Sequence, residues 1–149
     1  MILLAHMLLG AVVGYQIENI PLAIVLAFLC HYFLDLFPHV EYSINNLHDK
    51  KWKKSLPDMA KVFLDFILGL GIIFLVSKNQ PLIYIGALIA IVPDGLTLIS
   101  YAFPNKVMAA HDYIHTKKIH YFKYKKISNF WRILTQVISV SICILVLLR

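Results

Sequence analysis

One apolar stretch of the sequence carries three side chains that could bind a metal ion, His31, Asp35 and His39. They are spaced four residues apart, so in a helix they would share one face. Imidazole and carboxylate groups on adjacent turns reach a common point, which suits a divalent metal. Hydrogen bonding to neighbouring helices is the alternative, but a stripe of three such residues favours the metal. His39 follows Pro38, so a metal ligand, a catalytic general acid and a solvated residue all stay open for it.

Asp94 interrupts another apolar segment, between Pro93 and Gly95. Proline bends a helix and glycine permits close approach, so this carboxylate lies at a predicted kink. An unpaired carboxylate is costly there, and a metal ion or His31 would satisfy it. A bond to a neighbouring helix is the simpler alternative. We interpret Asp94 as a metal ligand and as the main catalytic candidate. His6, alone in the first apolar segment, is a further candidate ligand because we expect it at the same depth.

The polar segment after residue 104 contains two more imidazoles four residues apart, those of His111 and His115. A solvated pair fits the local pattern about as well as a pair of ligands. Their position beside the segment of Asp94 favours metal ligation. Asp112 is then a candidate for a carboxylate that orients a ligating histidine.

Three other polar residues receive weaker assignments. Asp65 follows Lys61 by four residues, so an ion pair within one helix competes with a role in orienting a ligating histidine. His120 lies among alternating aromatic and basic residues, a pattern typical of an interfacial anchor to anionic lipid headgroups. His48 lies in a polar loop and is expected to be solvated.

Motifs for other kinds of catalysis are missing from the sequence. It contains no G-x-S-x-G, no phosphate-cradling glycine loop and no C-x-x-C. If the protein is an enzyme, the expected nucleophile is therefore water activated by a metal ion.

The elements that must position these residues are apolar helices. Of the 149 residues, 60% are hydrophobic and 15% charged, against about 45–50% and about 25% in a soluble domain. The mean hydropathy is +0.74. This composition excludes a disordered chain and a disulfide scaffold, and it disfavours a soluble enzyme. We predict an all-α polytopic membrane bundle, one integral membrane domain over 1–149, with about five apolar helices and an interfacial amphipathic helix. The predicted ranges are 2–17, 20–40, 58–78, 81–103 and 128–148 for the apolar helices and 106–122 for the interfacial one.

The distribution of lysine predicts how the helices are oriented. The formal charge is +6, and the lysines gather in two connecting segments, 41–57 and 104–127. By the positive-inside rule, both segments and the N-terminus are expected on the cytoplasmic side of a prokaryotic inner or plasma membrane. The basic residues then meet anionic headgroups and membrane lipids, and no nucleic acid partner is expected. The candidate ligands are expected toward the same side.

Three short motifs also carry a family resemblance: Ala5-His6, His31-x-x-x-Asp35 and Pro93-Asp94. With them, the chain resembles small membrane proteins known as membrane-bound metal-dependent hydrolases, a group similar to zinc-dependent phospholipase C. The resemblance implies a helical metal site, phosphoester hydrolysis and four ligands, His6, His31, Asp35 and Asp94. The chain departs from the group in two ways. Pro-Asp follows the His-x-x-x-Asp helix instead of preceding it, and the group's His-Arg and Thr-His-Ser segment is absent, so His111 and His115 would replace it.

The function expected from these observations is metal-dependent hydrolysis of a phosphoester, on a lipid headgroup at the cytoplasmic interface. Zinc is the expected metal, with manganese as an alternative. A divalent metal or proton transporter is the main rival, since intramembrane His and Asp also build ion pathways. A non-catalytic membrane scaffold is the third possibility. The sequence leaves the oligomeric state open.

Overall fold

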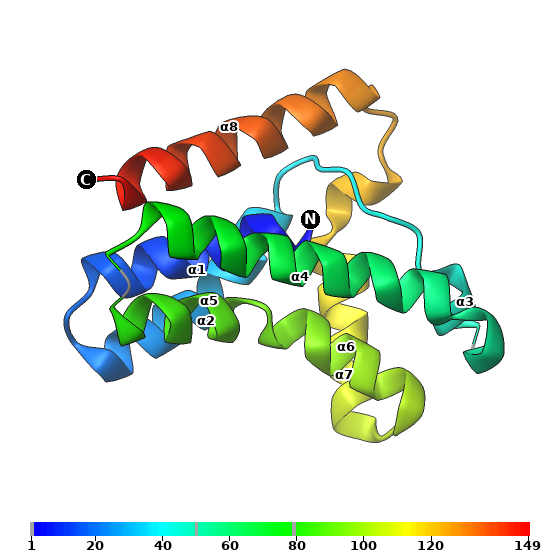
Figure 1. Ribbon diagram of the computed structural model, residues 1–149. Coiled ribbons are helices and arrows are strands. Elements are labelled where there is room, and N and C mark those ends of the chain that lie inside the picture. Colours follow the sequence, from blue (N-terminus) through cyan, green and yellow to red (C-terminus); the bar gives the residue numbers. More distant parts are fainter. Residues whose placement is uncertain (1, 50, 79) are drawn as a thin grey trace.

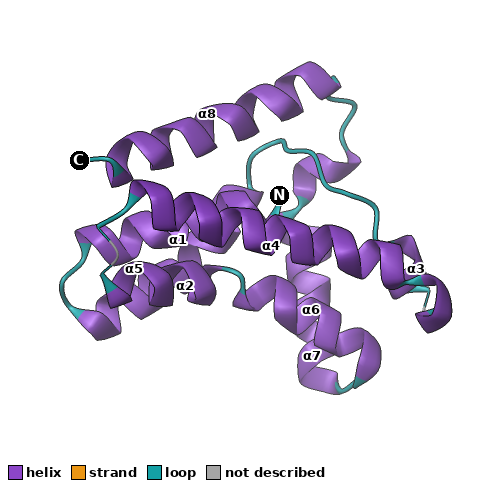
Figure 2. Ribbon diagram, viewed as in Figure 1, coloured by secondary structure: helices purple, strands orange, loops and turns teal. Residues whose placement is uncertain are grey.

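The computed structural model describes residues 2–49, 51–78 and 80–149, and all regular structure in these ranges is helical (Figure 2). This confirms the predicted all-α class. The elements, in chain order, are α1 (Leu3–Gln16), α2 (Ile20–Asp35), α3 (Asn45–His48), η1 (Trp52–Lys54), α4 (Leu56–Val76), α5 (Pro81–Ala90), α6 (Val92–Ala102), α7 (Lys106–Tyr113), η2 (Ile114–Ile119), η3 (Tyr121–Tyr124) and α8 (Asn129–Leu147).

Among the described residues, α4 and α8 are long and apolar enough to cross a membrane. The α5–α6 pair, bent by 44°, would make a third span if it counts as one. The helices α1 and α2 are apolar but have only 14 and 16 residues, fewer than the roughly 20 that a span needs. The structure is thus compatible with a membrane location, but it does not confirm about five membrane helices.

The short helix α1 lies at the centre of the bundle and contacts α2, α4, α5 and α8 (Figure 1). Most of its residues are buried, including Met7 and Leu8. Its closest neighbour is α5, because a Cβ at Gly10 would collide with the carbonyl oxygen of Gly86, and one at Gly86 with that of Gly10. The two backbones therefore touch, as the glycine pair at positions 10 and 14 suggests.

Replacing Gly86 with valine is expected to destabilise the bundle strongly. The new side chain has backbone as its neighbour, and backbone cannot move aside. Overpacking in a core costs about 1–3 kcal/mol, and this site belongs at or above the upper end. Thermal unfolding in detergent measures the effect. Gly71→Val is the matched control, because a Cβ at Gly71 meets nothing within 4 Å. Equal melting temperatures for the two variants would contradict the close α1–α5 contact.

The exposed apolar surface is compatible with a membrane location. The turns joining α1 to α2 and α4 to α5 lie at one end of the bundle together with the C-terminus (Figure 1). The segment that contains α3 lies at the opposite end. Large apolar side chains are exposed along α2, α4 and α8, for example Phe33, Leu75 and Ile142. Exposed apolar surface of this extent is typical of contact with lipid or protein.

Two predicted helices end or break earlier than the sequence pattern suggests, in each case close to a proline. The helix predicted over 20–40 ends at Asp35, since Pro38 lacks an N–H and disfavours helical backbone at the residue before it. His39 therefore lies on a loop. The helix predicted over 81–103 is divided at Ile91, two residues before Pro93, into α5 and α6, which are bent by 44°, so the kink predicted at Pro93 is confirmed.

The predicted interfacial helix over 106–122 also differs. Its first part is α7, and from Ile114 to Ile119 the chain winds as a π-helix, η2. This wider winding directs side chains into the bundle, with His115 only 2% exposed.

Candidate metal centre

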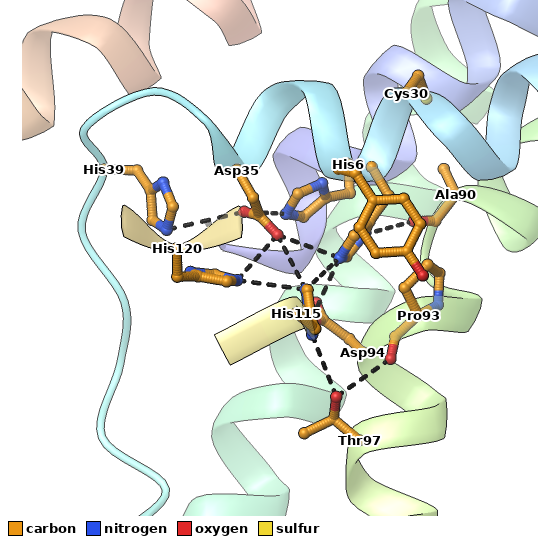
Figure 3. Close-up of polar contacts among 12 residues, drawn as sticks. His6, Cys30, Asp35, His39, Ala90, Pro93, Asp94, Thr97, His115 and His120 are labelled. Carbon is orange, nitrogen blue, oxygen red and sulfur yellow. Dashed lines mark hydrogen bonds and ion pairs between the residues drawn. The ribbon is translucent and has the colours of Figure 1, made fainter. Parts of the chain in front are cut away.

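The carboxylate of Asp35, at the end of α2, is surrounded by imidazoles (Figure 3). Its Oδ2 lies 3.1 Å from His31 Nε2, 3.2 Å from His115 Nε2 and 3.0 Å from His120 Nε2. Its Oδ1 lies 3.2 Å from His6 Nε2 and 3.7 Å from His39 Nε2. All six side chains are buried. Five imidazole nitrogens from α1, α2, η2 and two loop positions thus converge on one carboxylate.

The opposite nitrogen of several of these rings is held by a neighbouring oxygen. His31 Nδ1 lies 2.7 Å from the Ala90 carbonyl oxygen, at the break between α5 and α6. His39 Nδ1 lies 2.7 Å from the Phe37 carbonyl oxygen, and His115 Nδ1 lies 3.1 Å from Thr97 Oγ1. Histidines that bind metals are oriented in this way, with one nitrogen fixed by an oxygen and the other directed at the ion.

These contacts decide which nitrogen carries the hydrogen. A carbonyl oxygen only accepts, so Nδ1 of His31 and of His39 donates, and in the neutral ring Nε2 presents a lone pair. Lone pairs of His31 and His39 then point toward the Asp35 carboxylate. Such a set of acceptors requires positive charge between them, from added protons or from a metal ion.

Three overlapping groups could hold a metal ion, because within each group the ligand atoms lie within 4.8 Å of one another. The spacing is close to that of a real site. Around zinc bound at about 2.0–2.1 Å, tetrahedral ligands are about 3.3 Å apart, and the Nε2 atoms of His31 and His115 are 3.0 Å apart. The groups are His6–His31–Asp94, His31–Asp35–His115 and Asp35–His39–His120.

Asp94 lies at the margin of this cluster, in the first turn of α6. Its Oδ1 is 3.7 Å from His31 Nε2 and 3.9 Å from His115 Nε2. Its side chain is 29% exposed, whereas that of Asp35 is fully buried. His6 stacks on His31, with ring centroids 4.0 Å apart. The structure thus brings together six predicted residues, namely His6, His31, Asp35, His39, Asp94 and His115.

His120 also belongs to the cluster, although its sequence context favoured a role as a lipid anchor. Residues five apart lie about 140° apart around an α-helix, so the pair His115 and His120 gives no helical signal. The π-helical winding of η2 corrects this offset, with the His120 N–H donating to the His115 carbonyl oxygen at 3.1 Å. The two Nε2 atoms are 3.2 Å apart. Single-turn π-segments frequently occur at functional sites.

Glu41 is a second residue that the sequence did not single out. Its Oε1 lies 2.8 Å from His120 Nδ1 and 3.1 Å from His39 Nε2. Burial lowers the pKa of His120, but the carboxylates of Asp35 and Glu41 outweigh this effect and raise it to about 9. Without a metal ion, His120 therefore holds a proton at neutral pH.

Arg132, on α8, holds the two loops that carry His39 and His120. Its guanidinium donates to the carbonyl oxygen of His39 at 3.1 Å and to that of Phe122 at 2.9 Å. Gln136, one turn further on, accepts from the Val40 N–H at 3.2 Å. The last helix thus fixes the backbone of the two segments that carry these imidazoles.

Three other predicted site residues have different contacts. His111 Nε2 lies 3.1 Å from the Tyr32 hydroxyl, and burial lowers the pKa of His111. Asp65 Oδ2 accepts from the Leu4 N–H at 3.2 Å, so this carboxylate caps the start of α1. The structure does not bring His111 or Asp65 into the cluster.

The alternative ion pair of Asp65 with Lys61 is also replaced, because Lys61 pairs with Asp58 at 3.4 Å. Asp112 accepts from the Thr116 hydroxyl through its backbone carbonyl, and its buried Oδ1 has no hydrogen-bond partner. The groups that orient the ligands are instead Ala90, Thr97, Phe37 and Glu41. The side chain of His48 lies outside the described part of the structure.

Replacing His120 with alanine is expected to weaken metal binding more than replacing His111. His120 faces Asp35, whereas His111 faces Tyr32. The measurement is a titration of detergent-purified protein with Zn²⁺, with His111→Ala as the matched control. We expect a loss of affinity of at least about 10-fold for His120→Ala, and little change for the control. The reverse order would return His120 to the role of a lipid anchor.

A cavity of about 650 Å³ adjoins the cluster. Four of the candidate ligands, His39, Asp94, His115 and His120, lie on its wall, as does Glu41. Its size falls within the range of roughly 300–1,000 Å³ typical of sites for small molecules. The candidate ligands are therefore accessible to a small molecule from this side.

No known protein family, curated protein or solved structure matches the chain.

Proposed function

We propose that the protein is a metal-dependent hydrolase that cleaves a phosphoester, on a lipid headgroup at the membrane interface. The observation that carries the proposal is the convergence of five buried imidazole Nε2 atoms on the carboxylate of Asp35. Zinc is our proposed metal, with manganese as the alternative, because imidazole and carboxylate are ligands for both.

The donor set fits a metal ion. His31 and His39 are fixed in the tautomer that presents Nε2, and Asp35 supplies two oxygens that face different imidazoles. When bound, a divalent metal lowers the pKa of water to about 7 and stabilises charge on phosphoryl oxygens. The residues that would supply its ligands belong to overlapping groups, in which His31 and Asp35 are shared. They are His6, His31, Asp35, His39, His115 and His120.

Asp94 is our proposed general base. Its longer contacts with the imidazoles and its partial exposure leave an oxygen directed toward the cavity. A carboxylate there can accept a proton from the attacking water. Its assignment as a metal ligand stays open, since it completes the group with His6 and His31. His39, our second catalytic candidate, lines the same cavity. In that role its Nε2 is protonated and donates to the leaving group, and the metal ion is held by the other residues of the cluster.

The packing of α1 supports hydrolysis over transport. After His6, the buried side chains of α1 are apolar, among them Met7, Leu8 and Ala11. They pack in one core with Ile73 of α4 and Ile83 of α5. A pathway for ions needs polar groups along its length, whereas the interior next to the cluster is apolar and closed by the α1–α5 contact. A scaffold would need no converging ligand atoms.

The test is hydrolysis of a short-chain phospholipid and of an aryl phosphate by detergent-purified protein. We expect turnover that is abolished by a chelator and restored by Zn²⁺ or Mn²⁺. A protein that binds metal but cleaves neither substrate would favour the transporter. A protein that does neither would favour the scaffold.

A further inference from the structure

A second cavity, of about 440 Å³, lies beside the first and has an apolar wall. The two share Leu3, Val62, Asp94 and Leu98, so they meet at the margin of the metal centre. Asp94 is the one ionisable residue on the wall of the second cavity, which we call the apolar groove. A cavity that carries candidate metal ligands thus continues into an apolar groove, with a catalytic candidate at the junction.

The groove is formed by matching helix faces. Its wall on α4 consists of Met59, Val62, Phe63 and Phe66, spaced as one side of a helix. The rest of the wall includes Ile91 at the α5–α6 break, Gly95 and Leu98 of α6, and Leu47 of α3. Met59 and Phe63 are 53% and 61% exposed, so the groove opens on the apolar surface of α4.

We propose that the apolar groove binds an acyl chain of the substrate while its phosphoester lies in the first cavity, beside the candidate metal ligands. This inference rests on the proposed function. The substrate is then a membrane phospholipid that enters sideways from the bilayer, not a water-soluble phosphate. The continuity of the two cavities supports this occupant, because only an amphiphile has a polar and an apolar part joined at one point. The groove volume is that of a site for a small molecule.

Gly95 makes the groove testable. A Cβ at Gly95 would meet nothing within 4 Å, so a larger side chain can be added without a backbone clash. Leucine at this position would occupy the groove and is also favoured over glycine in a helix. Gly71→Leu is the matched control, since Gly71 lies on α4 outside the groove and has the same open surroundings.

The first arm compares kcat/KM for a phospholipid with that for an aryl phosphate that has no acyl chain. In Gly95→Leu we expect the ratio of the two to fall about 10-fold or more, because several methylenes lose their pocket. Gly71→Leu should keep the parent ratio. A ratio unchanged in Gly95→Leu would overturn the proposal.

The second arm does not depend on activity. A phospholipid with a photoactivatable diazirine at mid-chain is placed in phosphatidylcholine vesicles with the protein, and cross-linked residues are mapped by mass spectrometry. We expect cross-links concentrated on Met59, Phe63 and Leu98, lost in Gly95→Leu and kept in Gly71→Leu. An even distribution over α2, α4 and α8 would mean ordinary surrounding lipid and overturn the site. Cross-links confined to the groove in a protein without turnover would leave the lipid site and remove only the hydrolase.

Discussion

Asp35→Asn is expected to lose nearly all bound metal while the bundle stays folded. The carboxylate lies within 3.2 Å of four imidazole Nε2 atoms and belongs to two of the three candidate metal groups. Losing a residue that only orients a ligand weakens binding by about 10- to 100-fold, so losing this shared carboxylate should cost more than about 100-fold. The amide keeps the shape but has no charge. The measurement is a Zn²⁺ titration of detergent-purified protein, with helical content monitored by circular dichroism.

Asp58→Asn is the matched control for this experiment. Asp58 is also a buried carboxylate near a helix terminus, but it accepts from the Asn46 N–H and pairs with Lys61. We expect its variant to bind metal as the parent does. Parent-like affinity in Asp35→Asn would mean that the cluster only joins helices.

Asp94→Asn is expected to lower turnover of a phospholipid by about 10²- to 10⁴-fold, the usual contribution of a general base. Metal binding should fall much less than in Asp35→Asn, because the contacts of Asp94 with His31 and His115 are longer. The amide cannot accept the proton, although it still fills the wall of the cavity. Turnover and bound metal are measured on the same preparation.

The control here is Asp49→Asn, since Asp49 is exposed and paired with Lys51 at 2.8 Å. Its turnover should equal that of the parent. If Asp94→Asn retains full turnover, Asp94 is not the base. If it loses metal as completely as Asp35→Asn does, its main role is ligation.

The sequence was most informative where the relevant residues lie on one regular helix. Four-residue spacing related His31 to Asp35, and a polar residue in an apolar segment identified His6 and Asp94. These four come together in the structure. The pattern of turns and prolines also located the apolar segments. It did not predict where the helices near Pro38 and Pro93 stop, because the helical backbone ends at Asp35 and Ala90, before each proline.

What the sequence could not predict depends on irregular backbone and on tertiary contacts. His120 joins His115 only because the chain winds as a π-helix there, and single-residue spacing rules assume an α-helix. Glu41 lies in a loop whose path is fixed from α8 through Arg132. His111 has the expected spacing, but Tyr32 is its neighbour. A pattern within one segment carries no information on such contacts between segments.

The central claim is that the buried histidines and Asp35 hold a divalent metal ion, and elemental analysis of the detergent-purified parent protein tests it most directly. The sample is stripped with a chelator, incubated with Zn²⁺ or Mn²⁺, and freed of loose ions by gel filtration. The account predicts at least about one equivalent of metal per chain after reloading, as the donor set requires. A parent protein that stays folded and retains no metal under these conditions would contradict it.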